Sequence, residues 1–307
     1  MDTGTNPTKS LGSEKFLYPL QVMLDGWRKV DPPTMKKLPI EVDIPELLAN
    51  LGRKPDASPK DKAVGELTLI AFYYLLRVGE YTCKGTRNET KQTVQFRICD
   101  VTFFKFDEAD DCLKQLPRDA SDEDILSADG ATLMLANQKN GWKGVCIHHH
   151  ANGDDFLCPV RALGRRIVEI RQHTTNMSTN LSAFWTHGKR SDVTDVHIRQ
   201  SLKWAAEQLK YPERGIPIER IDTHSLRAGG ANALHLCGYE DREIQKMGRW
   251  RGETFKEYIS DCLRGFSEGM SKDMRKKFNF VNIEGGVWHD VTSTTINSPY
   301  SINAKAA

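Results

Sequence analysis

The sequence lacks the cysteine pattern of a disulfide-stapled or zinc-binding protein. It contains seven cysteines, an odd number, and these are widely spaced with no C-x-x-C pair among them. Small secreted scaffolds and structural zinc sites depend on cysteines at short, regular spacings. We therefore expect free thiols, no metal site and a reducing compartment.

The sequence also lacks a segment that could cross a membrane or direct the chain out of the cell. Its most apolar run, residues 67–78, contains Arg77 and is shorter than the ~20 residues that span a bilayer. Residues 1–13 are polar and have no apolar signal-peptide core. We expect neither a membrane partner nor secretion.

Charge of one sign is not in excess either. The formal net charge is +2, with 39% apolar and 27% charged residues, which is the composition of an ordinary folded protein. A polyanion-binding protein often carries a larger positive excess. Acidic stretches at 107–111 and 119–124 could mask a local basic surface. A nucleic-acid partner therefore has to be argued from individual residues.

The sequence does contain helical patterns on both sides of one block of strand patterns. Apolar residues recur at helical spacing in most of the chain, whereas the block alternates and holds Asn140-Gly141, a tight-turn signal. These patterns predict a mostly α protein with a small antiparallel β-sheet (α+β). The predicted helices are 14–30, 45–51, 59–79, 159–172, 194–209, 224–236, 241–247 and 254–263, and the predicted strands are 93–98, 101–106, 131–136 and 145–148.

Breaks in these patterns divide the chain into three parts. Asp31-Pro32-Pro33 separates a tail with one helix, residues 1–37, from a compact domain over 38–280. Residues 281–307 are expected to form a flexible tail. Some conspicuous side chains receive no functional role: we expect Trp204 in the core, and surface positions for His148 to His150 and for Arg161, Arg165, Arg166 and Arg171.

One segment brings a histidine and an arginine together. His224 and Arg227 lie three residues apart at the start of a predicted helix, so they share one face. A helix N-terminus and a guanidinium group both bind anions, and histidine exchanges a proton near neutral pH. The alternative is a capping histidine beside a surface arginine, which H-x-x-R alone would favour.

A tyrosine follows at a distance that suits the same chemistry. Tyr258 comes after Gly248-Arg249-Trp250. A phenol with a pKa near ~10 is a poor nucleophile, but nearby guanidinium groups would favour its anion. The Trp250 indole N–H could donate to a phosphate oxygen. Alternatively, Tyr258 could belong to a helical core stripe with Phe255, Ile259 and Cys262.

Two cations upstream complete the set. Arg77 ends an apolar helix pattern, where its charge requires a partner. Glu80 could be that partner, and so could a bound phosphate. Lys139 lies beside the Asn140-Gly141 turn, where it could protonate a leaving oxygen, and Lys143 competes for that role. Either lysine could also be an ordinary solvated turn residue.

Together these residues resemble the tyrosine recombinase (phage-type integrase) family. The family carries arginine, lysine, H-x-x-R, histidine or tryptophan, and tyrosine in that chain order. This sequence supplies them as Arg77, Lys139, His224, Arg227, Trp250 and Tyr258. The surrounding residues agree as well, in Leu76-Arg77-x-x-Glu80, His224-Ser-Leu-Arg227-Ala-Gly-Gly and Gly248-x-Trp250. The resemblance covers roughly residues 38–263 and implies a catalytic domain over 38–280.

The resemblance implies a site-specific recombinase or integrase from a mobile element. Tyr258 would attack a DNA phosphate held by Arg77 and Arg227, forming a 3′-phosphotyrosyl bond. Lys139 would protonate the leaving 5′-oxygen, and His224 would assist proton transfer with Tyr258. No metal or cofactor is implied. The implied partners are double-stranded DNA and further copies of the chain in a tetramer, in the nucleus of a eukaryote or the cytoplasm or nucleoid of a bacterium.

The chain departs from the family at its beginning. Family members carry a helical DNA-clamping domain before the catalytic one, whereas residues 1–37 have room for one helix. We expect that domain to be missing, truncated or encoded elsewhere. Three alternatives therefore stand beside the recombinase: a domesticated, non-catalytic DNA-binding module, a type IB topoisomerase, and an unrelated helical protein with chance matches.

Overall fold

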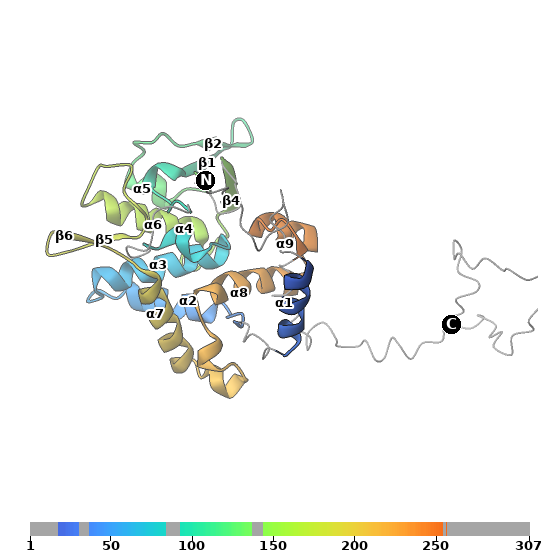
Figure 1. Cartoon of the computed structure of the whole chain (residues 1–307). Helices are drawn as coiled ribbons and strands as arrows, with labels where there is room; N and C mark the ends of the chain where they lie inside the picture. The colour runs from blue at the N-terminus through green and yellow to red at the C-terminus, as the bar shows by residue number, and fades with distance from the viewer. Residues whose placement is uncertain (1–17, 31–36, 84–92, 137–143, 254–255, 257–307) are drawn as a thin grey trace, which may run out of the picture.

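The computed structural model describes residues 18–30, 37–83, 93–136, 144–253 and 256 (Figure 1). It confirms a mostly α fold with a small antiparallel sheet. The helices are α1 (Tyr18–Val30), α2 (Asp43–Gly52), α3 (Pro59–Tyr73), α4 (Val78–Tyr81), α5 (Asp122–Leu126), α6 (Pro159–Arg171), α7 (Asp195–Gln208), α8 (Thr223–Leu236) and α9 (Asp241–Gly248). The strands are β1 (Val101–Asp107), β2 (Cys112–Gln115), β3 (Gly130–Leu135), β4 (Val145–His150), β5 (Ala183–Thr186) and β6 (Lys189–Asp192).

Helix α3 is the centre of the core. Ser58 caps its N-terminus by accepting a hydrogen bond from the Asp61 N–H at 3.1 Å, and Pro59 occupies the first turn. Residues from Ala63 to Phe72 are buried all around the helix, because α2, α6, α7 and α8 pack against it on different sides. Figure 1 shows this helix in the middle of the molecule.

The four-stranded sheet has the order β2-β1-β3-β4, and every pair is antiparallel. Its apolar face follows the two-residue alternation of β-strands: Val101, Leu133 and Ile147 lie in register and are buried. This face packs toward α6. The two-stranded β5–β6 hairpin turns through His187 and Gly188, both with positive φ, as tight hairpins require.

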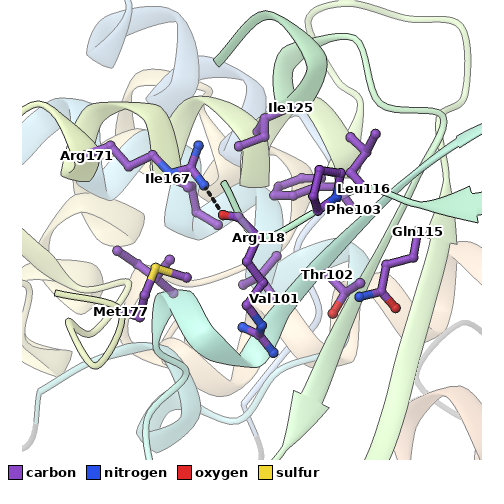
Figure 2. Close-up of a pocket in the computed structure, with 12 residues that line it drawn as sticks. Val101, Thr102, Phe103, Gln115, Leu116, Arg118, Ile125, Ile167, Arg171 and Met177 are labelled. Carbon is purple, nitrogen blue, oxygen red and sulfur yellow. Dashed lines mark hydrogen bonds between the residues drawn. The ribbon is translucent and has the colours of Figure 1, made fainter. Parts of the chain in front are cut away.

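A small pocket between the sheet and α6 is shown in Figure 2. Arg171 extends from α6 and donates hydrogen bonds of 2.8 Å to the Arg118 and Ala120 carbonyls, which fixes the segment before α5. The remaining volume is about 30 Å³, roughly the share of one water molecule. The pocket is therefore part of the core packing.

The structure corrects several expectations about individual elements. The predicted helix 59–79 ends at Tyr73, and α4 is a separate turn. Residues 93–98 form an isolated bridge through Arg97 instead of a strand. Four short elements were not predicted: α5, β2, β5 and β6. Within residues 254–263, only Lys256 lies among the described residues.

The expected positions of several large side chains were also wrong. Trp204 is 43% exposed. His149 points inward, shares a 2.9 Å hydrogen bond with the Tyr73 carbonyl, and packs edge-on against Tyr74. Burial is the main reason that the pKa of His149 falls to about 4.

The arginines of α6 are not a solvated face. Arg166 is fully buried, donates to the Leu181 and Ala183 carbonyls, and pairs with Glu169 at 2.8 Å. Arg165 pairs with Glu66 at 2.8 Å. These arginines therefore connect α6 to its neighbours.

In the described part of the chain, no helix is both long enough and apolar enough to cross a membrane.

Candidate active site

Helices α3 and α9 end in the same way, and their ends meet. In each, a residue with left-handed φ, Leu75 at +48° or Arg249 at +58°, follows the last turn. The next N–H then bonds back along the helix, from Leu76 to the Ala71 carbonyl at 2.9 Å and from Trp250 to the Gln245 carbonyl at 3.1 Å. This is the Schellman motif, which usually has glycine at the left-handed position. Non-glycine residues there are strained, and such strain gathers at functional sites.

The Leu75 carbonyl lies where three segments converge. It accepts a hydrogen bond from Arg227 Nη1 on α8 and one of 3.0 Å from Arg249 Nη2 after α9. The left-handed turn at Leu75 is what directs this carbonyl toward both guanidinium groups. One backbone oxygen thus joins the α3–α4 connection, the start of α8 and the end of α9.

Arg227 is held on several sides. It is 2% exposed, and its Nη2 donates to the Gly248 carbonyl. Its Cζ lies 4.1 Å from the centroid of the Trp250 ring, in a cation–π contact. These backbone and ring partners fix the orientation of the fork, and none of the three is an anion. A guanidinium group has five N–H donors, so anchoring to two carbonyls is compatible with binding an anion.

Glycines make this packing sterically feasible. A Cβ on Gly229 would overlap the backbone carbonyl of Ile40, and one on Gly230 would overlap that of Phe72. The glycine pair after Arg227 therefore lets α8 approach both the segment before α2 and helix α3 closely. A Cβ on Gly248 would overlap the Trp250 ring. The glycines of the two motifs therefore position Arg227 and Trp250 relative to α3.

Arg77 and Glu80 lie at the start of α4. Glu80 is fully buried and accepts hydrogen bonds from the Arg77 backbone N–H at 3.0 Å and from Arg77 Nη1 at 3.3 Å. Of the two partners considered for Arg77, the structure thus contains Glu80. The Arg77 side chain remains 21% exposed, so its guanidinium still faces solvent in part.

Arg249 was not predicted to belong to the site. It is 3% exposed, and its Nη2 forms a 3.0 Å ion pair with Glu80 Oε2. Burial lowers the pKa of Arg249, Glu80 opposes that shift, and Arg77 adds to it. Glu80 therefore bridges Arg77 and Arg249. The only signal in the sequence was the place of Arg249 between Gly248 and Trp250.

His224 occupies the first turn of α8. Asp222 caps that helix by accepting a 2.6 Å hydrogen bond from the Thr223 N–H. Partial desolvation lowers the pKa of His224, the positive charges of Arg227 and Arg77 lower it further, and Asp222 opposes them. The ring is therefore neutral at neutral pH and lies within electrostatic reach of both arginines.

The structure thus brings together five of the seven residues singled out from the sequence: Arg77, Glu80, His224, Arg227 and Trp250. Lys139 and Tyr258 lie outside the described residues, as does Lys143. Val145, the first residue of β4, and Trp250 line one cavity of about 550 Å³.

Comparison with known proteins gives matches among solved structures only. No protein-family model and no curated protein matches the sequence. The XerH site-specific recombinase bound to palindromic difH substrate, in a post-cleavage complex, is 14% identical with a TM-score of 0.48, over 78% of this chain and 54% of that chain. The XerA recombinase is 15% identical with a TM-score of 0.44, over 81% and 67% of the two chains. The Tn1549 transposon integrase in complex with transposon right-end DNA is 11% identical with a TM-score of 0.38, over 78% and 68%.

These proteins are recombinases and an integrase. This chain spans about half the length of the XerH structure that it matches, 54%. At these identities we base the function on the residues of the chain itself.

Proposed function

We propose that this chain is a tyrosine recombinase that cuts and rejoins double-stranded DNA through a covalent bond to Tyr258. The observation that supports this most is the convergence around Leu75. Arg77 shares the buried Glu80 carboxylate with Arg249, and Arg249 shares the Leu75 carbonyl with Arg227. Arg227 in turn contacts the Trp250 ring, so three separate segments are connected. Chance matches to a motif would have no reason to converge in this way.

In the proposed reaction the arginines bind a DNA phosphate before any bond changes. Arg77 and Arg227 hold two phosphate oxygens, and their charge stabilises the five-coordinate transition state. Rigid anchoring matters because a preoriented donor needs no reorganisation during the reaction. Arg227, fixed by two carbonyls and the Trp250 ring, meets this requirement.

The proposed bond changes are balanced. The Tyr258 oxygen loses its proton and forms a bond to phosphorus, while the bond from phosphorus to the 5′-oxygen breaks. His224, whose pKa is lowered, is neutral and can accept the tyrosine proton. Lys139 donates a proton to the departing 5′-oxygen. Attack by the 5′-hydroxyl of a partner strand then restores the DNA backbone and releases Tyr258.

Trapping the covalent intermediate tests this function. The purified chain is incubated with duplexes that carry a nick near the cleavage position or a bridging 5′-phosphorothiolate, and the products are separated on a denaturing gel. We expect a protein–DNA adduct that Tyr258→Phe and Arg227→Ala abolish. Tyr239→Phe is the matched control, because Tyr239 is 51% exposed and follows the end of α8.

The outcomes separate the recombinase from its alternatives. An adduct that persists in Tyr258→Phe would overturn the assignment of the nucleophile. Salt-dependent DNA retardation without any adduct would favour a non-catalytic binding module.

A further inference from the structure

A second cationic site lies beside the candidate active site. The cavity of about 550 Å³ opens between β4 and the C-terminal end of α9. Its walls include Val145 and Cys146 from β4, Lys246 from α9, and the segment from Arg249 to Arg251. Arg77, His224 and Arg227 are not among its lining residues. This cavity therefore adjoins the candidate active site through Arg249 and Trp250 and is not lined by those three side chains.

The charge of the cavity has one sign. Three of its lining residues are cationic, Lys246, Arg249 and Arg251, and among the described residues no acidic side chain lines it. The charge of Arg249 is balanced by Glu80. Lys246 and Arg251 line the cavity and are exposed. Two cations at the mouth of a concave site attract an anion.

The end of α9 does not oppose this attraction as a bare helix C-terminus would. Unpaired carbonyls at such an end repel anions. Here the Gln245 carbonyl accepts from the Trp250 N–H at 3.1 Å, and the Lys246 carbonyl accepts from the Arg249 N–H at 3.0 Å. The Gly248 carbonyl accepts from Arg227. Three of the last four carbonyls of α9 are therefore occupied by donors.

Arg249 adds a donor without an acceptor to the wall of the cavity. Its Nε is buried and has no hydrogen-bond partner among the described residues, although its two terminal nitrogens are bonded. A buried N–H without an acceptor is costly, and native structures rarely leave one. This unsatisfied donor belongs to a residue that lines the cavity.

We propose that this cavity is an anion subsite that holds a backbone phosphate of duplex DNA next to the reacting one. This inference rests on the proposed recombinase function. Trp250 separates the two subsites, because its ring covers Arg227 and also lines the cavity. Lys246 and Arg251, which line the cavity, supply the charge that attracts the neighbouring phosphate. The second contact fixes the position of the duplex relative to the first.

Cys146 gives a direct probe of the charge in the cavity, without DNA. It is exposed and lines the cavity. The full chain is treated with anionic sulfonatoethyl or cationic trimethylammonioethyl methanethiosulfonate, and labelling of each cysteine is followed by peptide mass spectrometry. We expect the ratio of anionic to cationic rate to be higher at Cys146 than at Cys112 and Cys237, which are exposed elsewhere.

Charge-removing variants make this test specific. Lys246→Gln and Arg251→Gln should each lower the ratio at Cys146 by about two- to threefold, the effect of one nearby charge in water. Lys54→Gln, at an exposed lysine outside the cavity, should leave the ratio unchanged. A ratio at Cys146 equal to that at the two control cysteines would overturn the anion subsite.

Protection of Cys146 identifies the ligand. We expect a duplex of random sequence to slow labelling of Cys146 at concentrations where inorganic phosphate does not. Lys246→Gln and Arg251→Gln should each reduce the slope of log K against log[salt] for duplex binding by about 1. If inorganic phosphate slowed the labelling of Cys146 and the duplex did not, DNA would be ruled out as the ligand. Because the labelling test needs no cleavage, its result is separate from the Tyr258 adduct that tests the function.

Discussion

Glu80 and Arg249 form a buried ion pair behind the side chains that would contact DNA. Glu80 accepts from Arg77 and from Arg249, and Arg249 shares the Leu75 carbonyl with Arg227. Neither member of the pair has more than a trace of exposure. A buried pair of this kind contributes little net stability, but removing one partner leaves an uncompensated charge. Through these contacts the pair holds Arg77 and Arg227 in place, the two arginines that we propose bind the phosphate.

Glu80→Gln should therefore be severely destabilising. It leaves the charge of Arg249 buried without a counter-ion, and we expect the free energy of unfolding to fall by about 3–5 kcal/mol. The Glu80→Gln, Arg249→Met double variant should recover much of this loss, because it buries no unpaired charge. Urea unfolding of the unchanged protein, Glu80→Gln, Arg249→Met and the double variant measures the coupling energy between the two residues. Additive losses would show that the pair is not coupled.

His224 leads to a prediction about pH. Desolvation and the two arginines hold its pKa below 6.5, so the ring is mostly neutral above pH 6.5 and becomes protonated as the pH falls below that value. If neutral His224 accepts the proton of Tyr258, the rate of adduct formation should be level above pH 6.5 and decline below it. In His224→Gln this decline should disappear and the level rate should be lower. A decline centred above pH 6.5, or one that persists in His224→Gln, would contradict the proposed role.

At the scale of elements, the places where α3 and α9 end determine where the side chains of the candidate site lie. A Schellman motif usually has glycine at its left-handed position, but here the left-handed residues are Leu75 and Arg249. The apolar pattern of α3 continues past Tyr73 without a stop signal, which is why a helix over 59–79 was predicted. The positions of Arg77 and Arg249 could not be derived, because both depend on where those helices end.

The close contact of α8 with its neighbours depends on Gly229-Gly230, a pair that stood out in the sequence only as part of the family motif. Gly229→Ala should push α8 away from the Ile40 backbone. We expect a loss of about 1–3 kcal/mol in unfolding free energy, the usual cost of overpacking, and slower adduct formation because Arg227 shifts from Leu75. Gly26→Ala in α1 is the control, since its Cβ meets nothing within 4 Å. Equal behaviour of both variants would contradict this account of the glycine pair.

At the scale of the whole molecule, the sequence predicted the order of the elements better than the exposure of single side chains. The main helices and three sheet strands follow from apolar periodicity, and they match α2, α6 to α9, β1, β3 and β4. Periodicity does not specify which neighbour covers each face. Trp204 was therefore expected in the core. Arg166, which is buried and bonds to Leu181, Ala183 and Glu169, was expected in solvent.

The assembly on DNA separates a recombinase from a topoisomerase with the same chemistry. Strand exchange needs the 5′-hydroxyl of a second duplex, so we expect four copies to assemble on two duplexes. The net charge of +2 adds little electrostatic repulsion between copies and little attraction to DNA. We therefore expect weak binding of single copies and cooperative assembly on duplexes with paired sites. Light scattering and mass photometry, with and without DNA, would measure this.

Relaxation of supercoiled plasmid, measured at several protein concentrations, tests the topoisomerase alternative. A topoisomerase relaxes it as a single copy, so the rate would rise in proportion to protein concentration. A recombinase that exchanges strands between sites should give a rate that rises more steeply, because the active species contains several copies. Linear concentration dependence with relaxation as the only product, in a protein that Tyr258→Phe inactivates, would replace the recombinase with the topoisomerase. Steeper dependence with joined products would favour strand exchange, since only an assembly can bring two cleaved strands together.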